Sequence, residues 1–433
     1  MSSRAVGSSR AFACVVSRYP AVSHSFILRE VRALRQRGID VHTFTIRRPD
    51  PGELLSVADR EEHARTFAVL PPRPLKLIGS HLRALFTHPL RYFGTLAAAQ
   101  RLSPPGARER LWRLFYFGEA MLVWSECRRR GLRHLHAHFA NVGSEVALLA
   151  ARFGGPEWSW SFMMHGSTEL FSEKPHRLPD KIRGARLVVC NSDFTRAQLM
   201  KLVGREEWGK LQVVRCGIDA GALAPRRQRA GGPLHILTVG RLVPGKGHAL
   251  LLEALYALRK RGVEVEATFV GDGPDRAGLE TLTHELMLHR QVRFAGAVGQ
   301  DELPDWYAQA DAFCLPTLAE GLGVVLLEAM AAGLPVVSTR VMGVPEVVED
   351  EATGLLVSPG RVDELADALE RLAASPDLCE RLGRHGRLRV DTEFALDAAT
   401  TRLIELFETT VPGISIGLSP SAPDGRATAA AAA

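Results

Sequence analysis

The sequence lacks the features that would place a protein within a membrane or in an oxidising compartment. No stretch reaches the ~20 uncharged apolar residues needed to span a bilayer, and the N-terminus has no apolar core of signal-peptide length. The six cysteines are scattered and include no Cys-x-x-Cys pair. These absences predict a cytoplasmic protein with reduced thiols and without a zinc or redox site.

The charge is divided unevenly along the chain. Residues 1–215 contain 34 Lys and Arg against 18 Asp and Glu, whereas the remaining residues contain 20 against 30. A basic half predicts contact with an anionic surface, such as membrane headgroups, a lipid phosphate or nucleic acid. Alternatively, the arginines are ordinary residues on solvent-exposed faces and bind no partner. Because no aromatic–basic nucleic-acid motif is present, we expect no nucleic-acid partner.

A chain of 433 residues is too long for one ordinary core. Short apolar runs alternate with amphipathic stretches, and six strands are expected in each half, which is typical of βαβ units and parallel sheets. We therefore predict an α/β fold with two Rossmann-like, doubly wound domains facing across a cleft. The expected parts are an N-terminal domain (1–218), a linker (219–232), a C-terminal domain (233–390), a helix crossing back to the first domain (391–410) and a disordered tail (411–433).

Residues 71–133 do not follow this alternation, because they mix aromatic and aliphatic side chains with arginine. Two interpretations stay open for the helices expected there. They lie on a membrane surface, or they pack on the first sheet with their arginines outward.

A glycine-rich turn between a strand and a helix, residues 238–248, is the first segment with a chemical signature. Gly240 and Gly247 allow the backbone to approach a phosphate, and the helix start offers free amides. Arg241 can bind phosphate oxygens with two N–H groups, and Lys246 adds a point charge. The spacing is not that of a Walker loop. The alternative is an ordinary charged turn.

The second segment, residues 316–335, contains two glutamates eight positions apart. Its helix is apolar except for Glu328, which we expect to be buried beside a partner. At 1.5 Å per residue the two carboxylates lie up to ~12 Å apart, too far for an acid/base pair at one bond. That span suits the ribose and the sugar ring of a sugar nucleotide. We expect Glu328 at the ribose and Glu320 at the sugar, with backbone amides on the phosphates. The expected donor-binding set also includes Gly321, Leu322, Gly323 and Val324. The alternative is one capping glutamate and one core ion pair.

The segments GRLVPGKG and EGLGVVLLEAMAAGLPVVSTRVMGVPEVV resemble the retaining glycosyltransferases of family 4, which have the GT-B fold. Four N-terminal segments are similar to its exopolysaccharide (colanic-acid-type) branch: YPAVSHSFILREVRALRQRGIDV, HLHAHFANVGSEVALLAARFG, MMHGSTELF and VVRCGID. The resemblance implies phosphate binding by Arg241 and Lys246, sugar contact by Glu320 and ribose contact by Glu328. It also implies retention of configuration without a metal or other cofactor, with a nucleoside-diphosphate sugar as donor and a lipid-linked or saccharide acceptor.

The sequence differs from the pattern of the family in two places. Many members have Gly-Gly where this chain has Met342-Gly343, which bears on a backbone contact to the donor. The glycine-rich loop that many members have after the first strand is replaced by residues 20–25. Ser23 and His24 are therefore acceptor-side candidates by position only.

Histidines form the third signature. His165 follows a strand in MMHGSTE and could bind a sugar hydroxyl or the developing phosphate charge. The resemblance implies that it contacts the donor sugar; a packing role is the alternative. His134, His136 and His138 face one side of a strand, and at ~6.5–7 Å spacing they are expected to be too spread for one metal ion. We interpret them as structural, with His138 nearest the cleft. Gly271, in a tight strand–helix turn, is expected to line the base pocket.

These observations predict a retaining hexosyltransferase in exopolysaccharide or other cell-surface glycan biosynthesis. We expect it to be cytoplasmic or peripheral at the inner face of the cell membrane, with anionic lipid contact through its basic half. The alternatives are a GT-B sugar-nucleotide epimerase, and a basic binding protein with a vestigial donor site.

Overall fold

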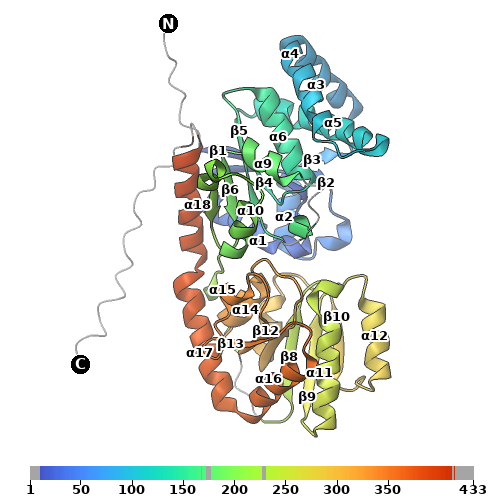
Figure 1. Ribbon diagram of the computed structural model, residues 1–433, viewed down its shortest axis with the longest axis vertical. Helices are drawn as coiled ribbons and strands as arrows, with labels where there is room; N and C mark the ends of the chain where they lie inside the picture. Colours follow the sequence, from blue (N-terminus) through green and yellow to red (C-terminus); the bar gives the residue numbers. More distant parts are fainter. Residues whose placement is uncertain (1–9, 167, 172–176, 227–230, 412–413, 415–433) are drawn as a thin grey trace, which may run out of the picture.

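The computed structural model describes residues 10–166, 168–171, 177–226, 231–411 and 414. The chain forms two parallel β-sheets, one after the other, and helices cover both (Figure 1). The two-domain α/β prediction is confirmed. Four residues of the expected linker (227–230), and all of the expected tail except 411 and 414, lie outside the described residues.

The N-terminal domain is built on a seven-stranded sheet of order β3-β2-β1-β4-β5-β6-β7. All neighbouring strands are parallel. The strands are β1 (Ala11–Arg18), β2 (Asp40–Arg47), β3 (Phe67–Leu70), β4 (His134–His138), β5 (Ser159–Met164), β6 (Leu187–Cys190) and β7 (Leu211–Val213). The expectation of six strands missed β3, an edge strand of four residues that is too short to show a periodic pattern.

The N-terminal helices lie on both faces of this sheet or extend beyond it. They are α1 (Ser25–Gln36), α2 (Val57–Arg65), α3 (Pro74–Thr87), α4 (Pro89–Arg101), α5 (Ala107–Arg129), α6 (Val142–Gly154), α7 (Thr168–Phe171), α9 (Leu178–Gly184) and α10 (Asp193–Met200). The second half of α5 packs in the core through residues such as Met121 and Trp124. In contrast, α3 and α4 lie at the end of the domain farthest from the second sheet (Figure 1).

The C-terminal domain has a six-stranded sheet of order β10-β9-β8-β11-β12-β13, again parallel throughout. Its strands are β8 (Leu234–Val239), β9 (Val265–Val270), β10 (Val292–Gly296), β11 (Ala312–Leu315), β12 (Val336–Thr339) and β13 (Gly354–Val357). The helices are α11 (His248–Lys260), α12 (Arg276–Glu285), α13 (Leu303–Gln309), α14 (Val324–Ala331), α15 (Val344–Val347) and α16 (Val362–Ala374). All six predicted strands are present in this half.

Two helices, α17 (Pro376–Glu393) and α18 (Leu396–Thr410), run along one side of the molecule from the second domain to the first (Figure 1). The helix expected over residues 391–410 is not continuous, because the chain leaves the helical conformation between α17 and α18, where it pairs with Ile218. The Ile218 N–H donates to the Phe394 carbonyl at 2.8 Å, and the Leu396 N–H donates to the Ile218 carbonyl at 3.1 Å. Beyond this break, Phe407 of α18 packs on Phe12 of β1 with ring centroids 5.2 Å apart.

The domains contact each other through segments that follow the carboxyl ends of their strands. The Glu346 carboxylate of α15 accepts the backbone N–H groups of Asp193 and Phe194 at 2.9 and 2.8 Å, at the start of α10. Arg215 donates to the same carboxylate at 3.0 Å. A carboxylate at a helix N-terminus is favoured by the helix dipole. The contact therefore fixes the two strand-end edges opposite each other, where ligands of parallel sheets bind.

None of the helices in the described part of the chain combines the length and the apolar composition that crossing a bilayer requires.

Candidate functional site

The glycine-rich turn after β8 is fastened to the end of β11. Gly247 takes a left-handed backbone (φ +69°), and a Cβ there would lie 2.0 Å from the Pro316 carbonyl oxygen, so only glycine fits. The Gly245 carbonyl accepts from the Thr317 hydroxyl at 2.9 Å and from the Leu318 N–H at 2.8 Å. The two segments singled out in the sequence therefore form one unit at the strand ends.

Lys246 and Glu320, one from each segment, form an ion pair. Both side chains are partly exposed, at 24% for Lys246 and 16% for Glu320. Arg241 is exposed, and among the described residues its guanidinium has no carboxylate partner. Its charge contributes to lowering the pKa of His24 in the other domain, after the larger effect of burial. A cation without a partner and a Lys–Glu pair can together receive an anionic, hydroxyl-bearing ligand.

Glu328 is buried, as expected from its apolar helix, and its partners are now identified. Arg29 Nη2 of α1 donates to Glu328 Oε1 at 2.6 Å, and the Tyr307 hydroxyl donates to Oε2 at 2.9 Å. Arg29 lies in the other domain, so this ion pair crosses the interface. A carboxylate has about four lone-pair positions, which leaves acceptor capacity for further hydroxyl groups.

The start of α14 provides backbone donors between the two glutamates. Gly323 precedes the helix in a left-handed conformation (φ +95°), and the first intrahelical bonds to its carbonyl come from the Leu326 and Leu327 N–H groups. The amides of Val324 and the residues before it have no helical carbonyl to bind, as at any helix start. Of the expected donor set, Gly321, Leu322 and Gly323 are buried, and Val324 is partly exposed.

Gly271 packs directly against the backbone of the turn that follows β8. A Cβ on Gly271 would lie 1.9 Å from the Gly240 carbonyl oxygen, and the Gly240 N–H donates to the Val270 carbonyl at 2.9 Å. The backbones after β8 and β9 thus run in direct contact, and no side chain fits between them. The structure places Gly240 and Gly271 together, which is what a shared ligand-facing edge requires.

Met342 has the left-handed backbone (φ +45°) that glycine adopts more readily. The next residue packs against the donor segment: a Cβ on Gly343 would lie 2.0 Å from the Gly321 carbonyl oxygen, and the Gly343 N–H donates to the Glu320 carbonyl at 3.2 Å. Met342 therefore preserves the turn and the contact of Gly343, but its backbone is strained because a side chain is present in the left-handed region.

His165 reaches the interface after β5, and its backbone faces the donor segment. A Cβ on Gly321 would lie 2.5 Å from the His165 carbonyl oxygen, which accepts from Asn191 Nδ2 at 2.9 Å. The imidazole is buried, and its Nε2 is hydrogen-bonded to His138 Nδ1 at 2.8 Å. Burial lowers the pKa of His165 well below its ordinary value, so the ring is neutral.

Behind His165 lies a polar cluster that strand spacing did not anticipate. The rings of His136 and His138 lean together, with centroids 5.1 Å apart, so the expected separation along the strand was wrong for the rings. One ligand atom each from Glu30, His136 and His138 lies within 4.8 Å of the others. Among the described residues, this group has the donor atoms that a metal ion would need. His138 is bonded to His165 through Nδ1, and its Nε2 lies 3.4 Å from Glu30 Oε1. That this cluster is structural and holds no metal stays a prediction.

The acceptor-side candidates are separated by the fold. Ser23 is exposed in a short 3₁₀ helix, η1 (Val22–His24). His24 Nδ1 is bonded to the Arg18 carbonyl at 3.0 Å, and burial lowers the pKa of His24 to about 4. His24 lies near Phe139, with ring centroids 5.0 Å apart. The structure therefore brings His24 and His165 to one edge, while His138 lies behind them.

Sequence reasoning missed Arg29, Tyr307 and Glu346. A buried Glu328 signalled that some partner exists, but both partners are distant in sequence and lie in amphipathic helices without a distinguishing pattern. Glu346 follows the Met342-Gly343 turn and gave no signal of its own.

Residues 223–389 match the family model described as "Glycosyl transferases group 1". The chain is 32% identical over 267 residues to a GDP-mannose-dependent alpha-(1-6)-phosphatidylinositol monomannoside mannosyltransferase of Mycobacterium tuberculosis, covering 58% of this chain and 67% of the relative. It is 31% identical over 287 residues to the putative colanic acid biosynthesis glycosyltransferase WcaL of Escherichia coli, covering 63% and 69%.

Two solved structures share the fold at low sequence identity. Sucrose-phosphate synthase from Thermosynechococcus elongatus superposes with a TM-score of 0.71 at 21% identity, covering 92% of this chain and 98% of the other. Anabaena Alr3699/HepE in complex with UDP and glucose gives 0.68 at 19% identity, covering 93% and 100%. Together with the two facing sheets, these likenesses establish the GT-B architecture.

Proposed function

The chain belongs to the group 1 glycosyltransferases of the GT4 type, and from this premise we propose that it transfers a hexose-type sugar from a nucleoside-diphosphate sugar to an acceptor hydroxyl, with retention. The observation that carries the proposal is the Lys246–Glu320 pair at the strand-end edge where α14 begins. Arg241 lies in the same turn as Lys246 and has no carboxylate partner among the described residues. Cations there match a diphosphate, and a carboxylate matches sugar hydroxyls.

The proposed donor orientation follows from which groups are charged and which are buried. Arg241, Lys246 and the first amides of α14 would hold the diphosphate and stabilise the charge that develops as it leaves. Glu320 would bind the sugar, and Glu328 would bind the ribose with its remaining acceptor capacity. The proposal of a sugar-nucleotide donor is supported by the relative whose name specifies GDP-mannose and by the neighbour solved with UDP and glucose.

Retention is proposed because the chain resembles the retaining glycosyltransferases of family 4. Lys246 pairs with Glu320, and Arg29 and Tyr307 bond to Glu328, so neither carboxylate is positioned as an obvious nucleophile. A same-face substitution assisted by the leaving phosphate requires no such nucleophile. Nε2 of the neutral His165 ring is bonded to His138, so its Nδ1, which contacts the Cys216 sulfur at 4.0 Å, is the atom that would hydrogen-bond the sugar without adding charge. We propose that no metal takes part.

The relatives' names supply the proposed setting. One acts on a phosphatidylinositol mannoside, and another is assigned to colanic acid biosynthesis. We therefore propose a lipid-linked or saccharide acceptor in a cell-surface glycan pathway, with the enzyme peripheral to a membrane.

The test is a donor screen with the purified full chain. UDP-, GDP- and ADP-sugars are offered with saccharide and lipid-linked acceptors, product mass is recorded, and the anomeric configuration is read by NMR. We expect one donor class to give a product heavier by one hexose, with the donor's configuration. Conversion of the donor to an epimer without any acceptor would overturn the transferase proposal, and an inverted product would overturn retention.

A further inference from the structure

Large apolar side chains are exposed on one part of the N-terminal domain. Ten of the fourteen large hydrophobic residues exposed in the described chain lie on α3, α4 and the first half of α5. Leu75, Phe86 and Leu90 are 85%, 79% and 89% exposed. The others are Ile78, Leu82, Phe93, Leu111, Trp112, Leu114 and Phe115. We call these ten residues the apolar face. A concentration of this kind marks an interaction surface, because isolated exposed hydrophobics would be scattered.

The segment that presents the apolar face is strongly basic. Residues 73–115 contain eight Lys and Arg and a single acid, Glu109. One of the eight, Arg113, is buried and paired with Glu145, but others such as Arg73, Lys76 and Arg83 are exposed. Apolar side chains interspersed with exposed cations are what an interfacial helix presents to anionic lipid headgroups. A surface that binds another protein has fewer charged residues at its centre than this segment has.

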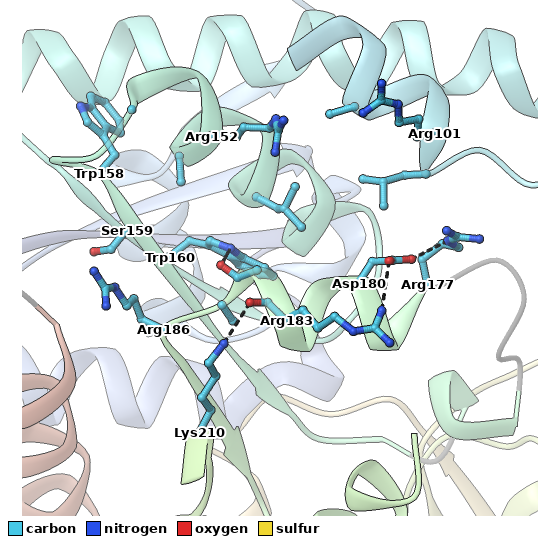
Figure 2. A pocket seen from close by; sticks show the side chains of 17 residues that line it. Arg101, Arg152, Trp158, Ser159, Trp160, Arg177, Asp180, Arg183, Arg186 and Lys210 are labelled. Atoms are coloured by element: carbon cyan, nitrogen blue, oxygen red, sulfur yellow. Dashed lines mark hydrogen bonds and ion pairs between the residues drawn. The ribbon is translucent and has the colours of Figure 1, made fainter. Parts of the chain in front are cut away.

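A cavity of about 650 Å³ opens beneath the end of α4, between α6, α9 and the start of β5 (Figure 2). Among the described residues that line it, six are basic and one, Asp180, is acidic. The indole rings of Trp158 and Trp160 form part of its wall. The basic residues are Arg101, Arg152, Arg177, Arg183, Arg186 and Lys210.

Half of these cations have no carboxylate to neutralise them. Asp180 pairs with Arg177 at 2.8 Å and with Arg183 at 3.5 Å, and Lys210 pairs with Glu207 at 2.6 Å. Within the described residues, Arg101, Arg152 and Arg186 have no carboxylate partner, and all three are exposed. Figure 2 shows arginine side chains from three different elements around the cavity. Arg101 and Arg152 lie on one side of the cavity and Arg186 on the other, and a guanidinium group is suited to bind a phosphate.

The cavity is not part of the proposed donor site. Ser159 begins β5, and Arg186 directly precedes β6, so the cavity lies at the amino ends of these strands. Lys246, Glu320 and His165 lie at carboxyl ends. The cavity and the apolar face share α4, since Arg101 ends the helix on which Leu90 and Phe93 are exposed.

We propose that the apolar face and the cavity together dock the protein on a bilayer that contains anionic phospholipid. The apolar side chains enter the headgroup region, the exposed cations of α3 and α4 meet neighbouring headgroups, and Arg101, Arg152 and Arg186 bind lipid phosphates at the cavity. This inference goes beyond sugar transfer and does not depend on it. The bilayer binds at the end of the N-terminal domain away from the C-terminal domain, which keeps the donor edge accessible (Figure 1).

The test is flotation of the full chain with vesicles of phosphatidylcholine alone or mixed with phosphatidylglycerol, at low and high salt, without donor or acceptor. We expect flotation with the mixed vesicles, at least ~10-fold weaker binding to phosphatidylcholine alone, and loss of part of the binding at high salt. Equal binding to both vesicle types would overturn the anionic part of the proposal. Failure to float with either would overturn the whole, whatever the transferase assay shows.

Variants separate the two components. Leu75, Phe86 and Leu90 are changed together to Ser, and Met287→Ser with Leu388→Ser serves as the control, because both are 61% exposed in the C-terminal half. We expect the triple variant to lose binding at least ~10-fold and the control to float like the parent. Equal loss in both would overturn the apolar face. Circular dichroism melting confirms that each variant is folded.

The cavity is tested with Arg152→Gln and Arg186→Gln combined, against Arg290→Gln, an exposed arginine of the other domain. We expect the cavity variant to bind mixed vesicles more weakly, with no change in the control. Titration with inorganic phosphate distinguishes a lipid from a free anion. Binding of free phosphate with unchanged flotation of the cavity variant would overturn the lipid assignment of the cavity.

Discussion

Glu328 is the residue at which a ribose-binding role and a purely structural role predict different results. The change Glu328→Gln keeps an amide oxygen for the Tyr307 hydroxyl but removes the negative charge that holds Arg29 and would hold ribose. A hydrogen bond to a charged group contributes about 1.5–3 kcal/mol. At about 1.4 kcal/mol per factor of ten, kcat/KM for the donor should fall roughly 10- to 100-fold.

Arg29→Gln is the matched control, because it breaks the same ion pair and leaves the carboxylate in place. The Arg29 side chain is 24% exposed, so we reduce the cost of breaking a buried pair to about 1–2 kcal/mol of unfolding free energy. Initial rates against donor concentration and urea unfolding are measured for both variants. We expect both to lose stability, but kcat/KM in Arg29→Gln to stay within about 3-fold of the parent. Equal losses of kcat/KM in the two variants would refute the ribose assignment and leave Glu328 as an ion-pair partner.

Three further predictions concern stability. Burial raises the pKa of Glu30 from 4.5 to about 8, so the folded protein retains a proton that the unfolded chain releases. The contribution of Glu30 to the free energy of unfolding is therefore greatest below about pH 4.5 and falls as the pH rises toward 8. In thermal unfolding, Glu30→Gln should lack this part of the pH dependence of stability. Met342→Gly should raise the unfolding free energy in urea by about 0.5–1 kcal/mol, because relief of the left-handed strain exceeds the entropy cost of glycine; a lower value would contradict the strain. Gly271→Ala should cost about 1–3 kcal/mol in the same assay, since its Cβ would collide with the Gly240 carbonyl, and an unchanged midpoint would show that this contact is not tight.

The sheet of the C-terminal domain could be predicted strand by strand, because each strand is a short apolar run followed by a turn rich in glycine or proline. The edge strand β3 could not, because its four residues carry no periodicity. The break between α17 and α18 could not be predicted either. It depends on Ile218, which lies far away in sequence and hydrogen-bonds to Phe394 and Leu396. Local pattern therefore specifies the elements, and long-range pairing corrects their ends.

In the candidate site, too, local sequence pattern predicted some features, and contacts between distant residues decided the others. The glycine-rich turn predicted that Lys246 lies at a strand end, and the apolar helix predicted that Glu328 is buried beside a partner. The partner of Glu328 was beyond prediction, because Arg29 comes from the other domain and looks like any helix-surface arginine. The side-chain tilt that brings His136 close to His138 was also inaccessible, since strand geometry fixes Cα spacing and not ring positions.

The central claim, that residues 240–247 and 320–328 bind a nucleoside-diphosphate sugar, is tested most directly by calorimetric titration of UDP, GDP and ADP. Lys246→Ala is compared with Lys260→Ala, an exposed lysine at the far end of α11. The account predicts that the parent chain and Lys260→Ala bind one nucleotide equally well, and that Lys246→Ala binds it at least ~10-fold more weakly through loss of a charge-assisted contact. Equal affinity in Lys246→Ala, or no binding of any of the three nucleotides by the parent chain, would contradict it.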